Sequence, residues 1–329
     1  MLIGVPAETL AGEARVAVTP ETAKKLISQG HTVRVQAGAG VTASVTDAAY
    51  AAVGAEVVNA ASAWGCDLVL KVRAPEAAEA SSIKAGSTVV GMLEPFNAEG
   101  LQRLATAGAT GFALEAAPRT TRAQSMDVLS SQANIAGYKA VMLAADKYQR
   151  FFPMLMTAAG TVKAARVVIL GVGVAGLQAI ATAKRLGAVV SAYDVRPSSA
   201  DEVKSMGAKF ISLELEALEG AGGYAREMTE ERAAKQRDLL TPYVAAADVL
   251  ITTASVPGRT APRWVTSNMV SQMAPGSVVV DLAAESGGNV EGSVAGEIIT
   301  TNNGVKIWGG KDVPSQLAYH ASMLFSRNV

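Results

Sequence analysis

Apolar and polar positions along the chain form blocks that predict short buried strands separated by helices. In the first third of the chain, apolar runs predict strands at Leu2–Val5, Thr32–Gln36, Asp67–Val72, Ser87–Met92 and Thr110–Leu114. Helical spacing predicts helices near Pro20–Gln29, Asp47–Val53 and Ala98–Ala107. Nearly continuous apolar strands that alternate with helices are typical of a parallel sheet covered on both faces.

A second series of strands follows a long predicted helix at about Val128–Tyr148. These strands are expected at Arg166–Leu170, Val189–Tyr193, Lys209–Ser212, Val249–Thr252, Ser277–Asp281 and Val305–Trp308. The last stretch, Ser315–Val329, is expected to return to the first domain as a helix. We therefore predict an α/β protein of two doubly wound, Rossmann-like parallel-sheet domains joined by the long helix. The first comprises residues 1–135 with 312–329, and the second comprises residues 136–311.

A glycine-rich turn opens the second domain, between its first strand and the helix that follows. Gly171, Gly173 and Gly176 stand in GxGxxG spacing directly after Arg166–Leu170. The next strand ends on Asp194, about 20 residues farther on, where a carboxylate can accept the hydroxyls of an adenosine ribose. The glycines permit a tight turn, a close approach of backbone to pyrophosphate and close packing of helix on strand. This unit is typical of dinucleotide binding, and a glycine turn that serves packing alone is the alternative.

The acid at the strand end also indicates which dinucleotide binds. Asp194 would repel the 2′-phosphate of NADP, so the sequence favours NAD(H). Arg196 can attract a phosphate, but we expect it to cover the adenine or a nearby charge. The first domain has no such glycine turn. We therefore predict that NAD(H) binds in the cleft between the two domains.

Composition narrows the class of protein. The 29 Lys and Arg residues balance the 29 Asp and Glu residues, which gives no basic surface for nucleic acid. Half of the residues are hydrophobic and only 18% are charged, which indicates apolar surface buried against another subunit. The single Cys66 excludes an internal disulfide and fits a reducing cytoplasm. Glycines divide the apolar stretch Val167–Ala183 into a strand and a helix, so we expect no membrane span.

The sequence offers few candidates for a catalytic base. An enzyme that oxidises an alcohol or an amine must also move a proton, most often through a histidine. The chain has two histidines, His31 and His320, and both positions are more typical of structural or surface residues. Direct hydride transfer between two nicotinamide rings needs no side-chain base, only two rings held face to face without water. The sequence is compatible with a protein that only positions its cofactor.

A long segment interrupts the second series of strands between Ser212 and the helix near Tyr243. It contains a run of glycines beside Tyr224 and exceeds the usual length of a crossover connection. The segment is a candidate mobile flap that carries Tyr224 to the site. A solvated, tolerated insertion is the alternative.

Several motifs resemble those shared by alanine dehydrogenases and proton-translocating transhydrogenases. They are Ile3–Pro6, Glu13–Pro20, Arg119–Ser131, Ala133–Tyr138, Thr252–Arg259 and Asp281–Asn289. The resemblance covers essentially the whole chain. Within this superfamily, the chain most resembles the NAD(H)-binding component of proton-translocating nicotinamide nucleotide transhydrogenase.

Three features favour the transhydrogenases over the alanine dehydrogenases. The transhydrogenase loop stands intact as Arg119, Gln124 and Asp127, and the segment around Tyr224 resembles the transhydrogenase mobile loop. The catalytic histidine that alanine dehydrogenases carry after the strand Ser87–Met92 is absent, since the chain continues Leu-Glu-Pro-Phe. Arg15 and Lys71 match substrate-binding positions of alanine dehydrogenases, but both groups of proteins retain them.

The resemblance implies a role for each matching position. It assigns the pyrophosphate to Gly171, Gly173, Val174, Ala175 and Gly176, and the adenosine side to Asp194, Val195 and Arg196. It assigns the nicotinamide end to Arg119, Asp127 and Ser130, with Gln124 steering the two rings together and Tyr224 closing the site. Ser255 stands where relatives place an apolar residue against the cofactor. From the residues alone, Arg119 and Asp127 also fit a loop ion pair and a helix start.

The resemblance also implies partners. The chain would form a homodimer and dock on an NADP(H)-binding component, and the membrane-spanning components of the transhydrogenase would translocate protons. It would lie in the cytoplasm, peripheral to the cytoplasmic face of the inner membrane. The alternatives are an alanine dehydrogenase-like NAD-dependent amino-acid dehydrogenase that uses Arg15 and Lys71, and a non-enzymatic NAD-sensing module. No metal is expected.

Overall fold

The computed structural model describes residues 1–118, 120–215, 229–256 and 258–329. The chain divides into two compact units, Met1–Ile135 with Pro314–Val329 as unit 1, and Ala136–Val313 as unit 2. Each unit contains one large, mainly parallel sheet, which confirms the predicted α/β class with Rossmann-like domains. In the part of the chain that the structure describes, no helix is long and apolar enough to cross a membrane.

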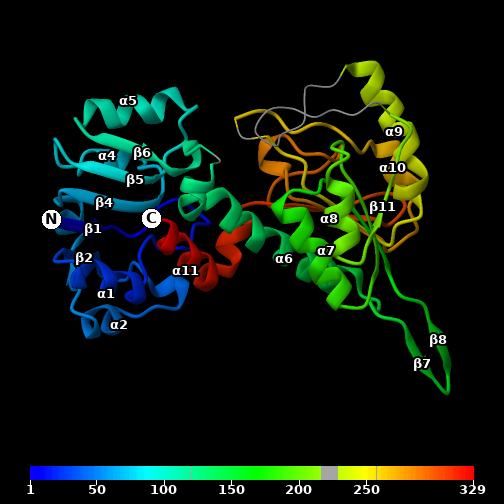
Figure 1. Ribbon diagram of the computed structural model, residues 1–329, viewed down its shortest axis with the longest axis horizontal. Helices are drawn as coiled ribbons and strands as arrows, with labels where there is room; N and C mark the ends of the chain where they lie inside the picture. Colours follow the sequence, from blue (N-terminus) through cyan, green and yellow to red (C-terminus); the bar gives the residue numbers. More distant parts are fainter. Residues whose placement is uncertain (119, 216–228, 257) are drawn as a thin grey trace. The chain divides into compact units, whose positions relative to one another are not determined.

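Unit 1 is built on a six-stranded sheet in the order β3-β2-β1-β4-β5-β6, and every pairing in it is parallel (Figure 1). Its strands are β1 Leu2–Val5, β2 Thr32–Gln36, β3 Glu56–Val58, β4 Leu68–Arg73, β5 Thr88–Met92 and β6 Thr110–Ala113. Its helices are α1 Pro20–Ser28, α2 Asp47–Ala52, α3 Ala60–Trp64, α4 Ala77–Ala80, α5 Ala98–Thr106 and α11 Ala318–Asn328. Short 3-10 turns lie at η1 Val41–Ala43, η2 Leu114–Ala116, η3 Thr121–Met126 and η6 Val313–Leu317.

The sheet of unit 1 is covered on both faces. Strand side chains such as Val5 and Val72 pack in one buried cluster that includes Tyr50 of α2 and Phe325 of α11. A second cluster joins neighbouring strand residues to α3 and α5. Because the chain returns through α11 to the core, the C-terminal segment belongs to the same unit as β1.

Unit 2 is built on a seven-stranded sheet in the order β11-β10-β9-β12-β13-β15-β14. Its strands are β9 Arg166–Leu170, β10 Val189–Tyr193, β11 Lys209–Phe210, β12 Val249–Thr252, β13 Val278–Asp281, β14 Ile298–Thr300 and β15 Lys306–Gly309. Its helices are α7 Val174–Arg185, α8 Ser199–Ser205, α9 Glu230–Ala245 and α10 Ser267–Ser271, with the 3-10 turn η5 Ala284–Ser286. The long helix α6 Val128–Tyr148 leads into this unit. The hairpin of β7 Leu155–Thr157 and β8 Gly160–Val162 projects from it (Figure 1).

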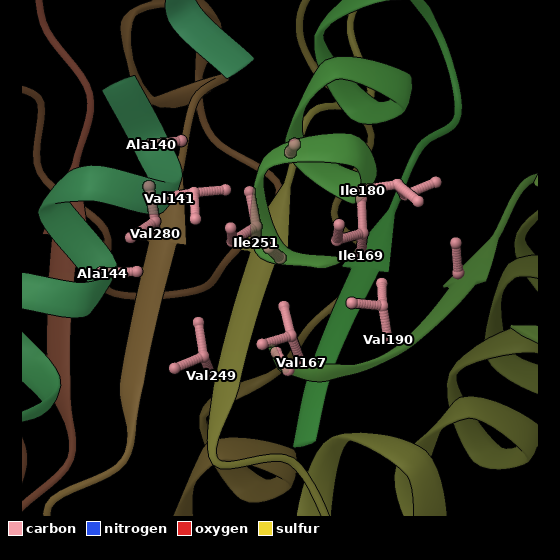
Figure 2. Close-up of a cluster of buried hydrophobic side chains, with 14 of the residues drawn as sticks. Ala140, Val141, Ala144, Val167, Ile169, Ile180, Val190, Val249, Ile251 and Val280 are labelled. Atoms are coloured by element: carbon pink, nitrogen blue, oxygen red, sulfur yellow. The ribbon is translucent and has the colours of Figure 1, made fainter. Parts of the chain in front are cut away.

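Alternate residues of the strands in unit 2 face two separate cores. Val167 and Ile169 of β9 and Ile251 of β12 pack with Ala140 of α6 and Ile180 of α7 (Figure 2). The intervening residues, such as Leu170 and Leu250, pack with α9 and α10 on the opposite face. This alternation explains why the strands read as continuous apolar runs, since both faces of the sheet are buried.

The structure departs from the prediction in the short elements. Strand β3, helices α3 and α4, and the β7–β8 hairpin are additional to the predicted series. Strand β14 pairs antiparallel with β15, so the sheet of unit 2 is mixed at that edge. The other elements lie within a few residues of their predicted bounds, and α6 spans Val128–Tyr148 as predicted.

Candidate nucleotide-binding site

The glycine turn after β9 adopts the geometry that its three glycines permit. Gly171 has a φ of +99°, and a Cβ there would lie 2.7 Å from Thr253 Oγ1. A Cβ on Gly176 would lie 2.0 Å from the carbonyl oxygen of Gly171, so only glycine lets α7 pack this close to the turn. By contrast, a Cβ on Gly173 would meet no atom within 4 Å. Packing therefore requires glycine at the first and third positions, whereas the second faces open space.

The open glycine stands at the N-terminus of α7. Gly173 is the N-cap residue of this helix, and no side chain of the described residues caps it. Its carbonyl accepts the first helical hydrogen bond, from the Leu177 N–H, 2.9 Å away. Val174 and Ala175, at the first two helical positions, are half-buried. The N–H groups of a first helical turn lack intrahelical partners and attract anions, so this end fits a pyrophosphate.

Asp194 connects the glycine turn to the end of β10. The side chain is 8% exposed, and its Oδ2 accepts a hydrogen bond from the Val172 N–H at 2.7 Å. Arg196 donates to the same carboxylate through its backbone N–H and Nε, each 2.9 Å from Oδ1, and through Nη2, 3.1 Å from Oδ2. Arg196 Nη2 also donates to the Val172 carbonyl at 3.0 Å. The predicted ribose acid therefore lies beside the glycine turn, with its charge paired to Arg196.

The other predicted residues on the adenosine and nicotinamide sides lie in different surroundings. Val195 is buried in the core cluster that faces α9 and α10, so its side chain serves packing. Ser255 is exposed in the segment that follows β12. Arg119 and Tyr224, both predicted site residues, lie outside the described residues.

The structure brings two of the predicted residues of unit 1 together at the start of α6. Asp127 accepts the Ser130 N–H at 2.9 Å and the Ser130 hydroxyl at 2.6 Å. These contacts are those of a residue that caps a helix. Gln124 is exposed in η3, and its carbonyl accepts the Asp127 N–H at 3.3 Å. The helix-start interpretation of Asp127 thus has direct support, and its proposed role toward a nicotinamide is additional to this cap.

Sequence reasoning assigned no role to Thr253 or Asn289, although both lie in motifs that carry the resemblance. Thr253 Oγ1 donates to the Gly171 carbonyl at 2.9 Å, and Asn289 bonds both backbone groups of Ala254. These side chains act through contacts between residues far apart in the sequence. The motifs themselves were the only signal that could have found them.

Arg15 and Lys71, the candidate substrate-binding residues of the alternative hypothesis, are buried in ion pairs. Arg15 is 2% exposed and binds Glu13 through two nitrogens, with Nε 2.8 Å from Oε1 and Nη2 2.6 Å from Oε2. Lys71 is 1% exposed, and its Nζ lies 2.6 Å from Glu79 Oε1 and 3.4 Å from Glu8 Oε2. Both cations therefore have carboxylate partners within the protein.

These pairs shift the carboxylates in opposite directions. Burial acts to raise the pKa of Glu13, but hydrogen bonds and the charge of Arg15, joined by the charge of Arg73, outweigh burial and lower it to about 2. At Glu8, burial dominates over the opposing charge of Lys71, and the pKa rises above its ordinary value. The Arg15 cluster thus holds a firmly ionised acid, whereas the Lys71 cluster disfavours a second negative charge.

The parallel sheets, the glycine turn and the strand-terminal acid define a Rossmann-like nicotinamide nucleotide-binding protein. The alanine dehydrogenase/PNT N-terminal domain matches residues 4–136, and the alanine dehydrogenase/PNT C-terminal domain matches residues 140–329. The chain therefore belongs to the alanine dehydrogenase/PNT family.

Known relatives place the chain nearer to the transhydrogenases in this family. It is 49% identical to an NAD(P) transhydrogenase alpha subunit of Rhodospirillum rubrum, over all of this chain and 88% of that protein. A transhydrogenase structure from Sinorhizobium meliloti superposes with a TM-score of 0.91 at 48% identity, covering all of this chain and 92% of that one. Alanine dehydrogenase of Mycobacterium tuberculosis is 33% identical, over 89% of this chain and 75% of that protein. The chain is thus a homologue of transhydrogenase alpha subunits and a more distant relative of alanine dehydrogenases.

Proposed function

We propose that this chain is the NAD(H)-binding component of a proton-translocating transhydrogenase. It passes a hydride between NAD(H) and NADP(H) held by a partner component. The observation that carries the proposal is the pairing of an open Gly173 at the start of α7 with Asp194 beside the same turn. Gly173 leaves space for a pyrophosphate, and Asp194 supplies a carboxylate for ribose hydroxyls.

The electrostatics of this corner support NAD(H) as the nucleotide. Asp194 carries negative charge where NADP would bring its 2′-phosphate, and the two would repel each other. The guanidinium of Arg196 is held against Asp194, which offsets its attraction for a phosphate. The proposal therefore assigns NADP(H) to the partner component.

The reaction asks little chemistry of the protein. The bound nicotinamide supplies or accepts the hydride, and the protein must bind, orient and exclude water. In the proposal, Gly171, Gly173, Val174, Ala175 and Gly176 hold the pyrophosphate, while Asp194, Val195 and Arg196 hold the adenosine side. Arg119, Asp127, Ser130 and Ser255 contribute to the nicotinamide end, Gln124 orients the two rings, and Tyr224 closes over them.

An alanine dehydrogenase activity is less well supported. It would need Arg15 and Lys71 to bind a substrate, and both are buried in ion pairs with Glu13 and Glu79. The loop after β5 carries no histidine to act as the base. Breaking either ion pair to admit a substrate would leave a buried charge without its partner, which is strongly unfavourable.

The proposed assembly follows from the proposed reaction. We infer a homodimer that docks on the NADP(H)-binding component and on membrane-spanning components at the cytoplasmic face of the inner membrane. Proton translocation takes place in those components. The isolated chain should bind NADH and show no turnover.

The proposal is tested by mixing the purified chain with an NADP(H)-binding transhydrogenase component. NADPH and an NAD⁺ analogue of distinct absorbance are supplied, and reduction of the analogue is followed. We expect reduction that requires both proteins. If the chain binds NADH and the partner yet transfers nothing, the proposal fails, and an NAD-sensing role is then favoured. NADH oxidation by the chain alone with pyruvate and ammonia would instead support the dehydrogenase.

A further inference from the structure

Two buried side chains organise the loops at the carboxyl ends of β12 and β13, and neither is one of the proposed nucleotide-binding residues. Asp281 ends β13 and is fully buried. Its Oδ1 accepts the Thr252 hydroxyl and the Ala283 N–H, each at 3.0 Å, and its Oδ2 accepts the Val290 N–H at 3.1 Å. Asp281 thus fixes the loop that carries Asn289 to the end of strand β12.

Asn289 is the second of these side chains, and it clamps the segment after β12. Its Oδ1 accepts the Ala254 N–H at 3.0 Å, and its Nδ2 donates to the Ala254 carbonyl at 2.8 Å. Nδ2 also donates to the Pro262 carbonyl at 2.9 Å. Asn289 is fully buried, so no water competes for these bonds. One amide therefore satisfies both backbone groups of Ala254 and fixes the path of the chain there.

The clamped segment in turn contacts the glycine turn. Thr253 follows β12 directly, and its hydroxyl donates to the Gly171 carbonyl at 2.9 Å. A Cβ on Gly171 would lie 2.9 Å from the Ala254 nitrogen, so the turn and the segment are in direct contact. Hydrogen bonds therefore run from Asp281 and Asn289 through Ala254 and Thr253 to the turn proposed to bind the pyrophosphate.

The order of the strands indicates which half of the nucleotide this segment meets. Strand β9 and the glycine turn lie between β10, which ends at Asp194, and β12, which ends at Thr252. A dinucleotide that spans such a sheet places its two halves on opposite sides of the glycine turn. With the adenosine at Asp194, the nicotinamide half lies over the segment after β12.

We propose that Asn289, fixed by Asp281, is a positioning residue that holds the segment Thr253–Ser255 in place for the nicotinamide half of the nucleotide. This inference rests on the proposed function, because it requires NAD(H) to bind at the glycine turn. It assigns Asn289 no contact with the nucleotide. The segment itself provides the contact, and Asn289 sets its position.

The test compares NADH with ADP-ribose, which lacks the nicotinamide ring. Binding of NADH is followed by its fluorescence and binding of ADP-ribose by calorimetry, for the wild type and for Asn289→Ala. Loss of the clamp leaves backbone groups of Ala254 unsatisfied, so we expect the Kd for NADH to rise about tenfold. The Kd for ADP-ribose should stay within about twofold of the wild type, because the adenosine side is untouched.

Asn303 provides a matched control in the same unit. Its Nδ2 donates to the carbonyls of Val270, Ser271 and Met273, so it also clamps a loop through backbone carbonyls. It lies in the turn before β15, at the opposite edge of the sheet from Gly171, because β15 runs parallel to β13. Asn303→Ala should lower the Tm and leave the ratio of the two Kd values unchanged.

Asn289→Asp covers the case in which the alanine variant does not fold. The aspartate keeps the shape and still accepts the Ala254 N–H, but it cannot donate to the two carbonyls. The Kd for NADH should again rise more than that for ADP-ribose. Equal weakening of both ligands, or the same ratio change in Asn303→Ala, would overturn the inference. A wild type that binds neither ADP-ribose nor NADH would overturn the proposed function and the inference with it.

Discussion

Arg196 and Asp194 form a two-point ion pair at the end of β10, with Nε 2.9 Å from Oδ1 and Nη2 3.1 Å from Oδ2. Backbone N–H groups of Val172 and Arg196 add one further bond to each oxygen. Each carboxylate oxygen thus already accepts two hydrogen bonds. For ribose hydroxyls to bind there, the guanidinium must yield at least one of its bonds.

This relationship predicts a change of nucleotide preference in Asp194→Ala. The variant loses the ribose acceptor and frees Arg196 to attract a 2′-phosphate, so NADH should bind about tenfold more weakly and NADPH more tightly. Fluorescence titration with both nucleotides measures the shift. Asp201→Ala, which removes an exposed acid of α8, is the control. An unchanged preference in Asp194→Ala would show that this carboxylate does not select the nucleotide.

The glycines of the turn should separate stability from binding. In Gly176→Ala, the new methyl group would lie 2.0 Å from the Gly171 carbonyl oxygen, so α7 must shift. We expect the free energy of unfolding to fall by about 1–3 kcal/mol. In Gly173→Ala, the methyl group meets open space at a φ of −85°, so stability should hold while NADH binds about tenfold more weakly. Urea unfolding and NADH titration measure the two effects. A stable Gly173→Ala that binds NADH normally would place the pyrophosphate elsewhere.

Gln124→Asn tests the proposed steering of the two rings. Gln124 is exposed, so the shorter side chain should leave the Tm and the NADH affinity unchanged. Hydride transfer to the partner should slow by about tenfold to a hundredfold, because small displacements of reacting groups cost that much rate. Gln102→Asn, at an exposed position of α5, is the matched control. A transfer rate equal to that of the wild type would remove Gln124 from the proposed reaction.

The buried Glu13 predicts how stability depends on pH. Its pKa is about 2 in the folded protein, against 4.5 for the ordinary carboxyl. An acid whose pKa is lower in the folded state stabilises the fold fully above pH 4.5, and this contribution disappears as the pH falls toward 2. Glu13→Gln should therefore cost about 3 kcal/mol near neutrality and much less near pH 2. Urea unfolding of both proteins across this range measures the difference, and a gap that does not narrow in acid would contradict the assignment.

The sequence was most informative where the structure depends on residues close together in the chain. The glycine turn, α7 and Asp194 were predicted because strand, turn and helix follow each other directly. Helix α6 was predicted with its bounds because 21 residues of helical pattern outweigh local ambiguity. Short edge strands were missed, since β3 has two exposed residues of three and carries no apolar run.

The contacts that organise the site could not be predicted in the same way. Asn289 reaches Ala254 across 35 residues, and only the pairing of β12 with β13 brings them together. The burial of Arg15 and Lys71 likewise depends on Glu13 and Glu79 meeting them inside unit 1. Sequence identified these residue types, but the fold decides whether each cation faces a substrate or a carboxylate.

The most direct test of the proposed reaction follows the hydrogen itself. NADPH that carries deuterium at the transferable ring position is mixed with NAD⁺, this chain and an NADP(H)-binding partner in ordinary water. Mass spectrometry then measures the label in the NADH formed. Direct transfer between the two rings predicts that the NADH retains the label in full, and that none forms when either protein is omitted. NADH without deuterium would mean that the hydrogen exchanges with solvent on the way, which contradicts direct hydride transfer.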